Sequence, residues 1–132
     1  MGWFGIYGNF TKMSQIKEAI KKEMTATYPS GDRVVTHTVE EISNHFGRAF
    51  VLSRYKVTKG FDVLSDFKYI SVVLWRKSKD ELMYKELDET CGPFEVRGCP
   101  LKYLKMADEP RNEYAKQFRD NVLEWHKERR KK

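Results

Sequence analysis

The chain has few residues of the kinds that mark several common protein classes. It contains 2 cysteines, 8 glycines and 4 prolines among 132 residues. Two cysteines are too few for a disulfide framework, so they are interpreted as thiols or metal ligands of an intracellular chain. The low glycine and proline content, with 40% hydrophobic residues, excludes disorder for most of the chain. A chain of this length is expected to form a single domain, residues 1–132, around one core.

Long apolar runs are also missing. The longest one, residues 70–75, is interrupted by Ser71 and closed by Arg76, well short of the roughly 20 apolar residues that cross a bilayer. The first residues are apolar, but they lack the basic segment and cleavage site of a signal peptide. Ile6 stands where a myristoylation signal needs Ser or Thr. These absences predict a soluble, cytoplasmic protein without a membrane partner.

Hydrophobic periodicity predicts the first half of an α+β fold. Aromatic residues separated by glycines favour a short strand within residues 3–10. In residues 11–25 the apolar side chains recur every three or four positions, which predicts an amphipathic helix. Residues 28–32 combine Pro, Ser, Gly and Asp and predict a turn. Segments rich in β-branched and aromatic residues then predict strands over 33–42, 49–58, 67–77 and, more weakly, 82–87.

The last third of the chain favours helices. Leu101, Leu104 and Met106 indicate about one or two helical turns. The sequence from Asp108 to Pro110 is typical of a helix start, and an apolar stripe continues from there to the end of the chain. The expected architecture is an antiparallel meander of about four strands with an N-terminal amphipathic helix and a long C-terminal helix.

The two cysteines suggest a candidate structural zinc site. Cys91 and Cys99 flank a loop rich in glycine and proline, and His37 and His45 are the expected partners that complete a tetrahedral set. Other candidate ligands are Asp88, Glu89 and His126. The alternative is that both cysteines are small buried thiols and both histidines make local hydrogen bonds. If the zinc ion is bound, it stabilises the loop and does not activate water.

No catalytic motif accompanies this candidate site. Asp88 and Glu89 are adjacent carboxylates, but neighbours in a strand point to opposite faces, which argues against joint acid-base action. The chain has no serine nucleophile elbow, no phosphate-binding glycine loop and no paired histidines at helical spacing with a glutamate. The sequence therefore predicts a binding protein and not an enzyme.

Basic residues predict the contact surface. The formal net charge is +6, from 25 Lys and Arg against 19 Asp and Glu, which favours an acidic protein or nucleic acid as partner. The candidate partner-binding residues are Lys17, Lys21, Lys22, Arg48, Arg54, Lys56, Arg129 and Arg130. Tyr55 and Phe50 lie among them and are candidate stacking platforms for bases. The alternative is a solvated face, with Arg54 and Lys56 on one side of a strand and Tyr55 on the other.

One resemblance gives these features a context. The start Met1-Gly2-Trp3, the block from Glu86 to Pro93, the sequence Cys99-Pro100-Leu101 and the pair Tyr114-Ala115 resemble a family of small uncharacterised proteins of phages and mobile elements. The resemblance implies an inhibitor of a host defence protein in the host cytoplasm. One such class is the anti-CRISPR proteins, which act by stoichiometric binding, for example by blocking nucleic-acid loading of a CRISPR effector. The alternative function is that of a basic nucleic-acid-binding accessory protein.

Overall fold

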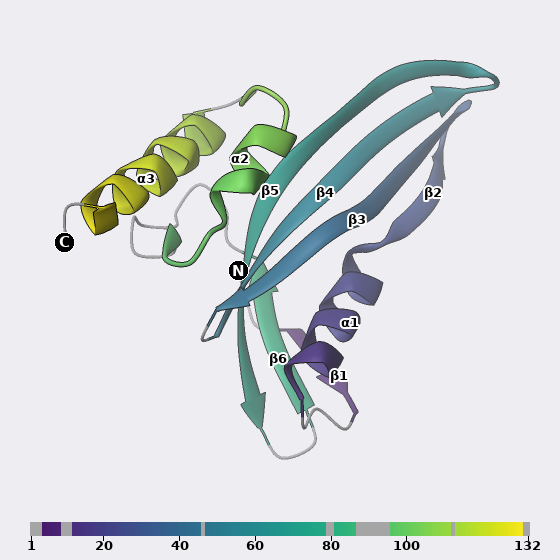
Figure 1. Ribbon diagram of the computed structural model, residues 1–132. Coiled ribbons are helices and arrows are strands. Elements are labelled where there is room, and N and C mark those ends of the chain that lie inside the picture. Colours follow the sequence, from purple (N-terminus) through teal and green to yellow (C-terminus); the bar gives the residue numbers. More distant parts are fainter. Residues whose placement is uncertain are drawn as a thin grey trace.

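The protein is described by a computed structural model with nine helices and strands among its described residues (Figure 1). The described residues are 4–8, 12–45, 47–78, 81–86, 96–111 and 113–130. The strands are β1 (Phe4–Tyr7), β2 (Ala26–Ser30), β3 (Arg33–His45), β4 (Arg48–Lys59), β5 (Asp62–Ser78) and β6 (Glu81–Glu86). The helices are α1 (Met13–Met24), α2 (Leu101–Met106) and α3 (Glu113–Arg130).

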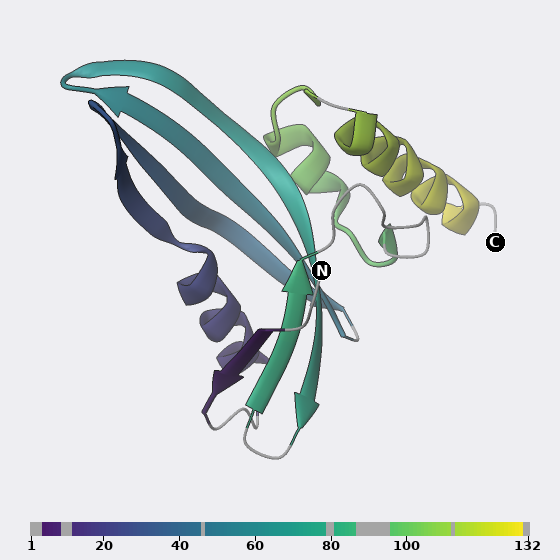
Figure 2. The same ribbon diagram turned by 180° about the vertical axis from the view of Figure 1, so that it is seen from behind.

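The strands form one antiparallel sheet that curls into a half-barrel (Figures 1 and 2). Its order is β1-β6-β5-β4-β3-β2. The expected meander of about four strands is therefore wrong: the sheet has six strands. The segment predicted as a turn at 28–32 is mostly β2, because Pro29 is compatible with an edge strand that needs no N–H on its outer side. The first short strand extends the sheet by pairing with β6.

Tight turns make the central strands longer than the sequence predicts. Gly47 and Gly60 adopt φ values of 86° and 61°, which residues with a side chain rarely adopt. Consequently β4 pairs with β5 from Lys59↔Asp62 back to Arg48↔Leu74. The expected strand at 67–77 thus begins several residues earlier, at Asp62. The glycines in the sequence indicate where the chain turns, but they do not indicate how far the strands on either side extend, because that depends on strand pairing.

The helices cover opposite faces of the sheet because side chains alternate along each strand. On one face, Ile16 and Ile20 of α1 pack with the β4 residues Ala49 and Val51. On the other face, α2 and α3 cover Phe50 and its neighbours; the buried residues of this cluster are Phe50, Leu52, Val72, Val96, Cys99, Tyr103, Phe118 and Val122. Two views from opposite sides show α1 and the α2–α3 pair separated by the sheet (Figures 1 and 2).

Part of the sheet extends beyond the helices as a ribbon. It consists of β2 with residues 33–38 of β3, 53–59 of β4 and 62–69 of β5, and we call it the arm (Figure 1). The distal part of the arm has no helix layer over it, and most side chains of the arm are partly or fully exposed, whereas Val35, Ser53 and Val57 are buried. The described part of the chain holds no helix that is long and apolar enough to cross a membrane.

Candidate functional site

Strand β3 has a neighbouring strand on both sides over only part of its length. β2 pairs with β3 only between Arg33 and His37. Within the described part of the chain, residues 38–44 of β3 pair with β4 on one side and with no strand on the other. In an antiparallel ladder, alternate residues direct their N–H and C=O groups away from the paired strand. This segment, which we call the open edge, therefore presents backbone groups that another strand can pair with.

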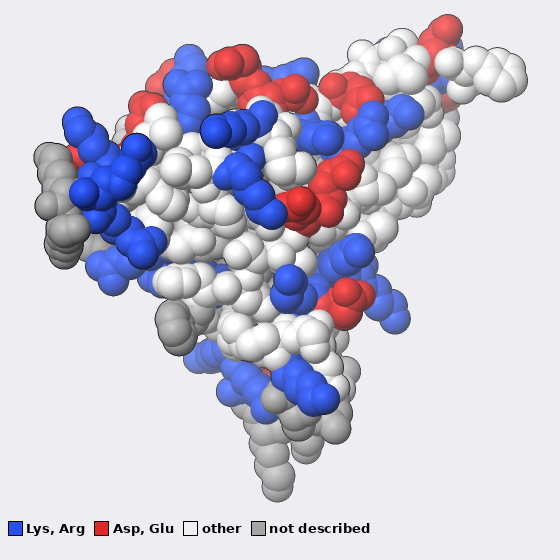
Figure 3. Space-filling model, in the orientation of Figure 1, with Lys and Arg blue, Asp and Glu red and all other residues white. Residues whose placement is uncertain are grey.

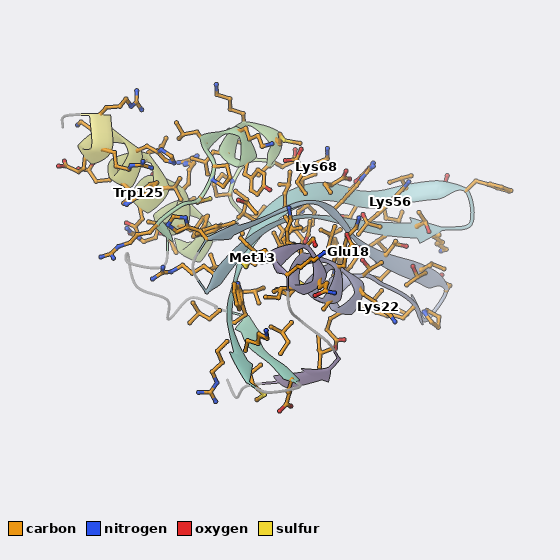
Figure 4. The ribbon with its side chains drawn as sticks, turned by 60° about the horizontal axis from the view of Figure 1, so that its bottom comes forward. Met13, Glu18, Lys22, Lys56, Lys68 and Trp125 are labelled. Carbon is orange, nitrogen blue, oxygen red and sulfur yellow. The ribbon has the colours of Figure 1, made fainter. Side chains whose placement is uncertain are left out.

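A groove of about 710 Å³ lies over the open edge. Its floor is residues 39–44 of β3, and its walls come from α1 on one face of the sheet and from the start of α2 on the other. The lining residues are Met13, Lys17, Glu18, Lys21, Val39, Glu40, Glu41, Ile42, Ser43, Asn44, Pro100, Lys102 and Tyr103. Figure 4 shows Met13 and Glu18 on the α1 wall. The volume falls within the usual range for ligand sites in proteins.

Side chains from the floor hold both walls in place. A bulge between Val39 and Glu41 shifts the register, and after it Glu41 points to the α2 side, where its carboxylate lies 3.1 Å from Lys102 Nζ. Asn44 points to the α1 side and donates from Nδ2 to the Met13 carbonyl at 3.4 Å. Its Oδ1 is buried without a hydrogen-bond partner among the described residues. The groove thus combines an open backbone edge with lysines and carboxylates.

The titratable groups behind the α2 wall are neutral at ordinary pH. Burial raises the pKa of the Cys99 thiol to about 12. Burial also raises the pKa of Tyr103 to about 12, with a smaller contribution from the negative charges of Glu41 and Cys99. A protonated, buried thiol is not a nucleophile. The lysines, carboxylates and open backbone groups of the groove can form ion pairs and hydrogen bonds.

A second feature is a row of aromatic rings across one face of the arm. We call Tyr28, His37, Tyr55, Phe67 and Tyr69 the aromatic row. Successive ring centroids are 6.0 Å apart from Tyr28 to His37, 5.1 Å from His37 to Tyr55, 5.1 Å from Tyr55 to Phe67 and 5.9 Å from Phe67 to Tyr69. His37 is paired with Tyr55 and Tyr55 with Phe67 across the strands, so these rings share one face.

The opposite face of the arm is charged. Arg54 and Asp66 form a two-point ion pair, with Arg54 Nε to Asp66 Oδ1 at 2.7 Å. The hydrogen bond and charge of Arg54 lower the pKa of Asp66, and the same pair raises the pKa of Arg54. Lys56 and Lys68 lie on the side of the strands away from α1 (Figure 4). The arm therefore has one aromatic and one charged face.

The structure separates the candidate zinc ligands that it describes. Cys91 lies outside the described residues. Cys99 is buried in the core beneath α3, where its carbonyl receives a hydrogen bond from His126 Nε2 at 2.7 Å. His37 belongs to the aromatic row, whereas the His45 ring packs against Gly98.

The two expected histidine ligands stand far from each other. They occupy positions 37 and 45 of β3, and at about 3.3 Å per residue they lie about 26 Å apart. One ion therefore cannot bind both. Across the described ranges, no group of three His, Cys, Asp or Glu residues gathers in a way that could hold a metal ion. A zinc site that uses Cys91 with Cys99 stays a prediction.

The candidate basic residues do not form one surface. Lys17 and Lys21 line the groove, whereas Lys22 is exposed on α1 outside it. Arg48 begins β4, with its Nε buried and without a hydrogen-bond partner among the described atoms. Arg54 and Lys56 belong to the charged face of the arm, and Arg129 and Arg130 lie in the last turn of α3. In Figure 3 the lysine and arginine side chains form several separate groups.

The aromatic row is the feature that sequence reasoning missed. Phe50, one of the two expected stacking residues, is fully buried in the core, whereas Tyr55 belongs to the row. The signal in the sequence was an aromatic or histidine at alternate positions of successive strands. It could be used only with the register, which places His37, Tyr55 and Phe67 side by side.

Comparisons with known proteins give no further guide. No family model matches the chain, and no curated protein or solved structure matches it. The similarity to small phage proteins therefore stays an interpretation of the sequence.

Proposed function

We propose that this protein is a stoichiometric binding protein that takes an extended segment of a partner protein along the open edge of β3. The observation that carries the proposal is the groove, whose floor is residues 39–44 of an unpaired strand edge. Strand addition of this kind gives affinity through backbone hydrogen bonds and specificity through alternate side chains. Residues 38–44 offer about 23 Å of edge at about 3.3 Å per residue, enough for a short strand.

The walls of the groove select a peptide over other occupants. α1 and the start of α2 lie on opposite faces of the sheet and flank the edge, so the space between them suits one strand better than the edge of another sheet with its own helices. The lining contains both lysines and glutamates, among them Lys17, Lys21, Glu18 and Glu40. Mixed charge suits a polypeptide with both kinds of side chain better than it suits a polyphosphate.

The biological role follows from binding without turnover. The partner class that we propose is a host defence protein, with a CRISPR effector as one candidate, in keeping with the resemblance to phage proteins. A segment held along the open edge is unavailable for its own contacts, including contacts that load nucleic acid. The neutral state of Cys99 and Tyr103 beside the groove is consistent with a binder.

The test begins with peptides selected from a random display library against the folded protein. Titration calorimetry of a selected peptide should give one equivalent per chain. Ser43→Pro and Asn44→Pro each remove one backbone N–H, and neighbouring N–H groups point in opposite directions along a strand. The substitution that removes an N–H bonded to β4 should lower the melting temperature. The other substitution removes an N–H that points into the groove. It should leave the melting temperature unchanged and weaken peptide binding by about ten-fold or more.

Matched controls separate the groove from general charge and from the Asn44 side chain. Lys17→Gln should weaken peptide binding, and Lys22→Gln, on the same helix but outside the groove, should not. Asn44→Ala removes the same side chain as Asn44→Pro but keeps the backbone N–H, so it measures how much of the effect of Asn44→Pro comes from the side chain. Wild-type affinity in the stable proline variant would refute strand addition. With an identified target, complete inhibition at well below one equivalent of this protein would refute stoichiometric action.

A further inference from the structure

We infer that the aromatic face of the arm is a binding site for single-stranded nucleic acid. The first observation is the aromatic row, whose rings lie 5.1 to 6.0 Å apart across four neighbouring strands. Tyr28 is 45% exposed and the other rings are partly exposed. Unpaired bases stack on aromatic side chains displayed on a sheet, commonly about two or three bases on one platform.

The second observation is the charge of this face. The register assigns to it the positions Ala26, Tyr28, Ser30, Arg33, Val35, His37, Ser53, Tyr55, Val57, Lys59, Asp62, Ser65, Phe67 and Tyr69. Asp62, paired with Lys59 at the tip of the arm, is the acidic residue among these positions. The positions around the rings, short of the tip, hold no carboxylate, whereas the opposite face contains Asp66 in its ion pair with Arg54. No like charge therefore opposes the phosphates beside the rings.

Cations stand at the margins of the row, where a backbone would pass. The Arg111 guanidinium lies 3.9 Å from the centre of the Phe67 ring. Lys21 and Lys22 occupy the last turn of α1, which leads directly into β2 and Tyr28. Arg33 belongs to the aromatic face itself, with its Nε 4.0 Å from the exposed Asp32 carboxylate. Rings in the middle with cations at the rim form the arrangement that tracks a single strand, since stacking takes the bases and cations take the phosphates.

Single strands are favoured over duplexes by the form of the site. The rings lie on a sheet and expose parts of their planes, and the bases of a duplex are already stacked and paired. A protein partner is the other possible occupant, but the aliphatic residues among the rings, Val35 and Val57, are buried at 6% and 7% exposure and offer it little apolar surface. This site shares only Lys21 with the lining of the groove, so it neither requires nor replaces the proposed peptide binding.

The experiment measures fluorescence anisotropy of a labelled oligothymidylate at low salt with the full-length protein. Tyr55→Leu and Phe67→Leu keep apolar volume and remove the rings, and each should weaken binding roughly ten-fold. Tyr28→Ser provides a second variant with little risk to folding, because this side chain is half exposed on the edge strand. Lys56→Gln, on the opposite face, is the matched control and should change the affinity by less than about two-fold.

Three outcomes would overturn the inference. These are no binding of the oligothymidylate at low salt, equal affinity in the folded ring variants, and a larger loss from Lys56→Gln than from Tyr28→Ser. An unlabelled duplex of equal length should compete poorly, and equal competition would also contradict a stacking site. The groove variant Lys17→Gln should leave the oligothymidylate affinity unchanged, so failure here does not decide the peptide proposal.

Discussion

Among the described residues, two strands inside the sheet, β5 and β3, each have a stretch with no strand on one side, and these two stretches are treated differently. β6 pairs with β5 only from Val73 to Ser78, so the preceding part of β5 has a free side. Asp108 closes that side at Lys68: the Lys68 N–H donates to Asp108 Oδ2 at 2.7 Å, and the Asp108 N–H donates to the Lys68 carbonyl at 3.0 Å. The open edge of β3 receives no such closure among the described residues. Exposed edges invite pairing with other chains, so of these two stretches the β3 edge is the one left for a partner.

One short segment acts at both edges. Residues 99–108 cross the sheet from the β3 side, where Lys102 pairs with Glu41, to the β5 side, where Asp108 caps Lys68. Between these ends, Cys99 and Tyr103 are buried against the sheet. Substitutions in this segment therefore test which of its contacts contributes most to the free energy of unfolding: the contact with β5, the contact with β3 or the buried core between them.

Alkaline pH should give the largest effect, through the core between the edges. The ordinary pKa is 9.0 for Cys99 and 10.0 for Tyr103, and burial raises both to about 12. Below pH 9 both groups are protonated in the folded and unfolded chains. As pH rises through 9 and then 10, the unfolded chain releases these protons first, so the free energy of unfolding falls with pH.

The loss should reach about 4 kcal/mol near pH 11, at about 1.4 kcal/mol per pH unit for each group. Urea unfolding at a series of pH values measures it. Cys99→Ala costs stability through its cavity at every pH, but it should flatten the decline between pH 9 and 10, where Tyr103 has not begun to contribute. Tyr103→Phe should flatten the decline above pH 10. An unchanged slope in both variants would mean that these groups are not buried in the folded protein.

Opening the closed edge should give an intermediate effect. Asp108→Ala removes the carboxylate that accepts the Lys68 N–H and should lower the free energy of unfolding by about 1.5 kcal/mol. Hydrogen exchange of the Lys68 amide should accelerate towards the rates of the outward-facing amides in residues 38–44 of β3. Glu109→Gln is the matched control, since its exposed side chain makes only a long contact with Arg119. Protection of Lys68 that survives Asp108→Ala would show that another group closes this edge.

The sequence predicts strand-forming segments better than it predicts edges. The apolar and β-branched residues of β3 and β4 identify these strands, and the spacing of Ile16 and Ile20 identifies a helix that buries one side. The stretches that lack a neighbouring strand depend on the register of the sheet. Strand β2 was not predicted because Pro29 and the residues after it are typical of a turn. The groove joins residues from α1, β3 and α2, and the capping pair joins positions 68 and 108, so neither leaves a local pattern.

The same limit applies to the candidate ligands. His37 and His45 were the expected partners of the two cysteines, but both histidines lie on one extended strand that holds them far apart. A short sequence separation indicates proximity only where the chain turns. For the basic residues, alternation separates Arg54 and Lys56 from Tyr55 in both the sequence and the structure. The cross-strand neighbours of Tyr55, which make the aromatic row, depend on register again.

The smallest effect should come from the β3 end of the crossing segment. Lys102→Gln removes the ion pair with Glu41, whose side chains are 64% and 36% exposed. Exposed ion pairs contribute little because water and salt screen them, so the free energy of unfolding should fall by less than about 1 kcal/mol. Urea unfolding at low and high salt checks this, with any loss confined to low salt. If Lys102→Gln destabilises the protein as much as Asp108→Ala does, the crossing segment is attached equally firmly at both edges. The β3 edge would then no longer be the looser of the two, and the contrast that marks it as the partner site would lose its energetic basis.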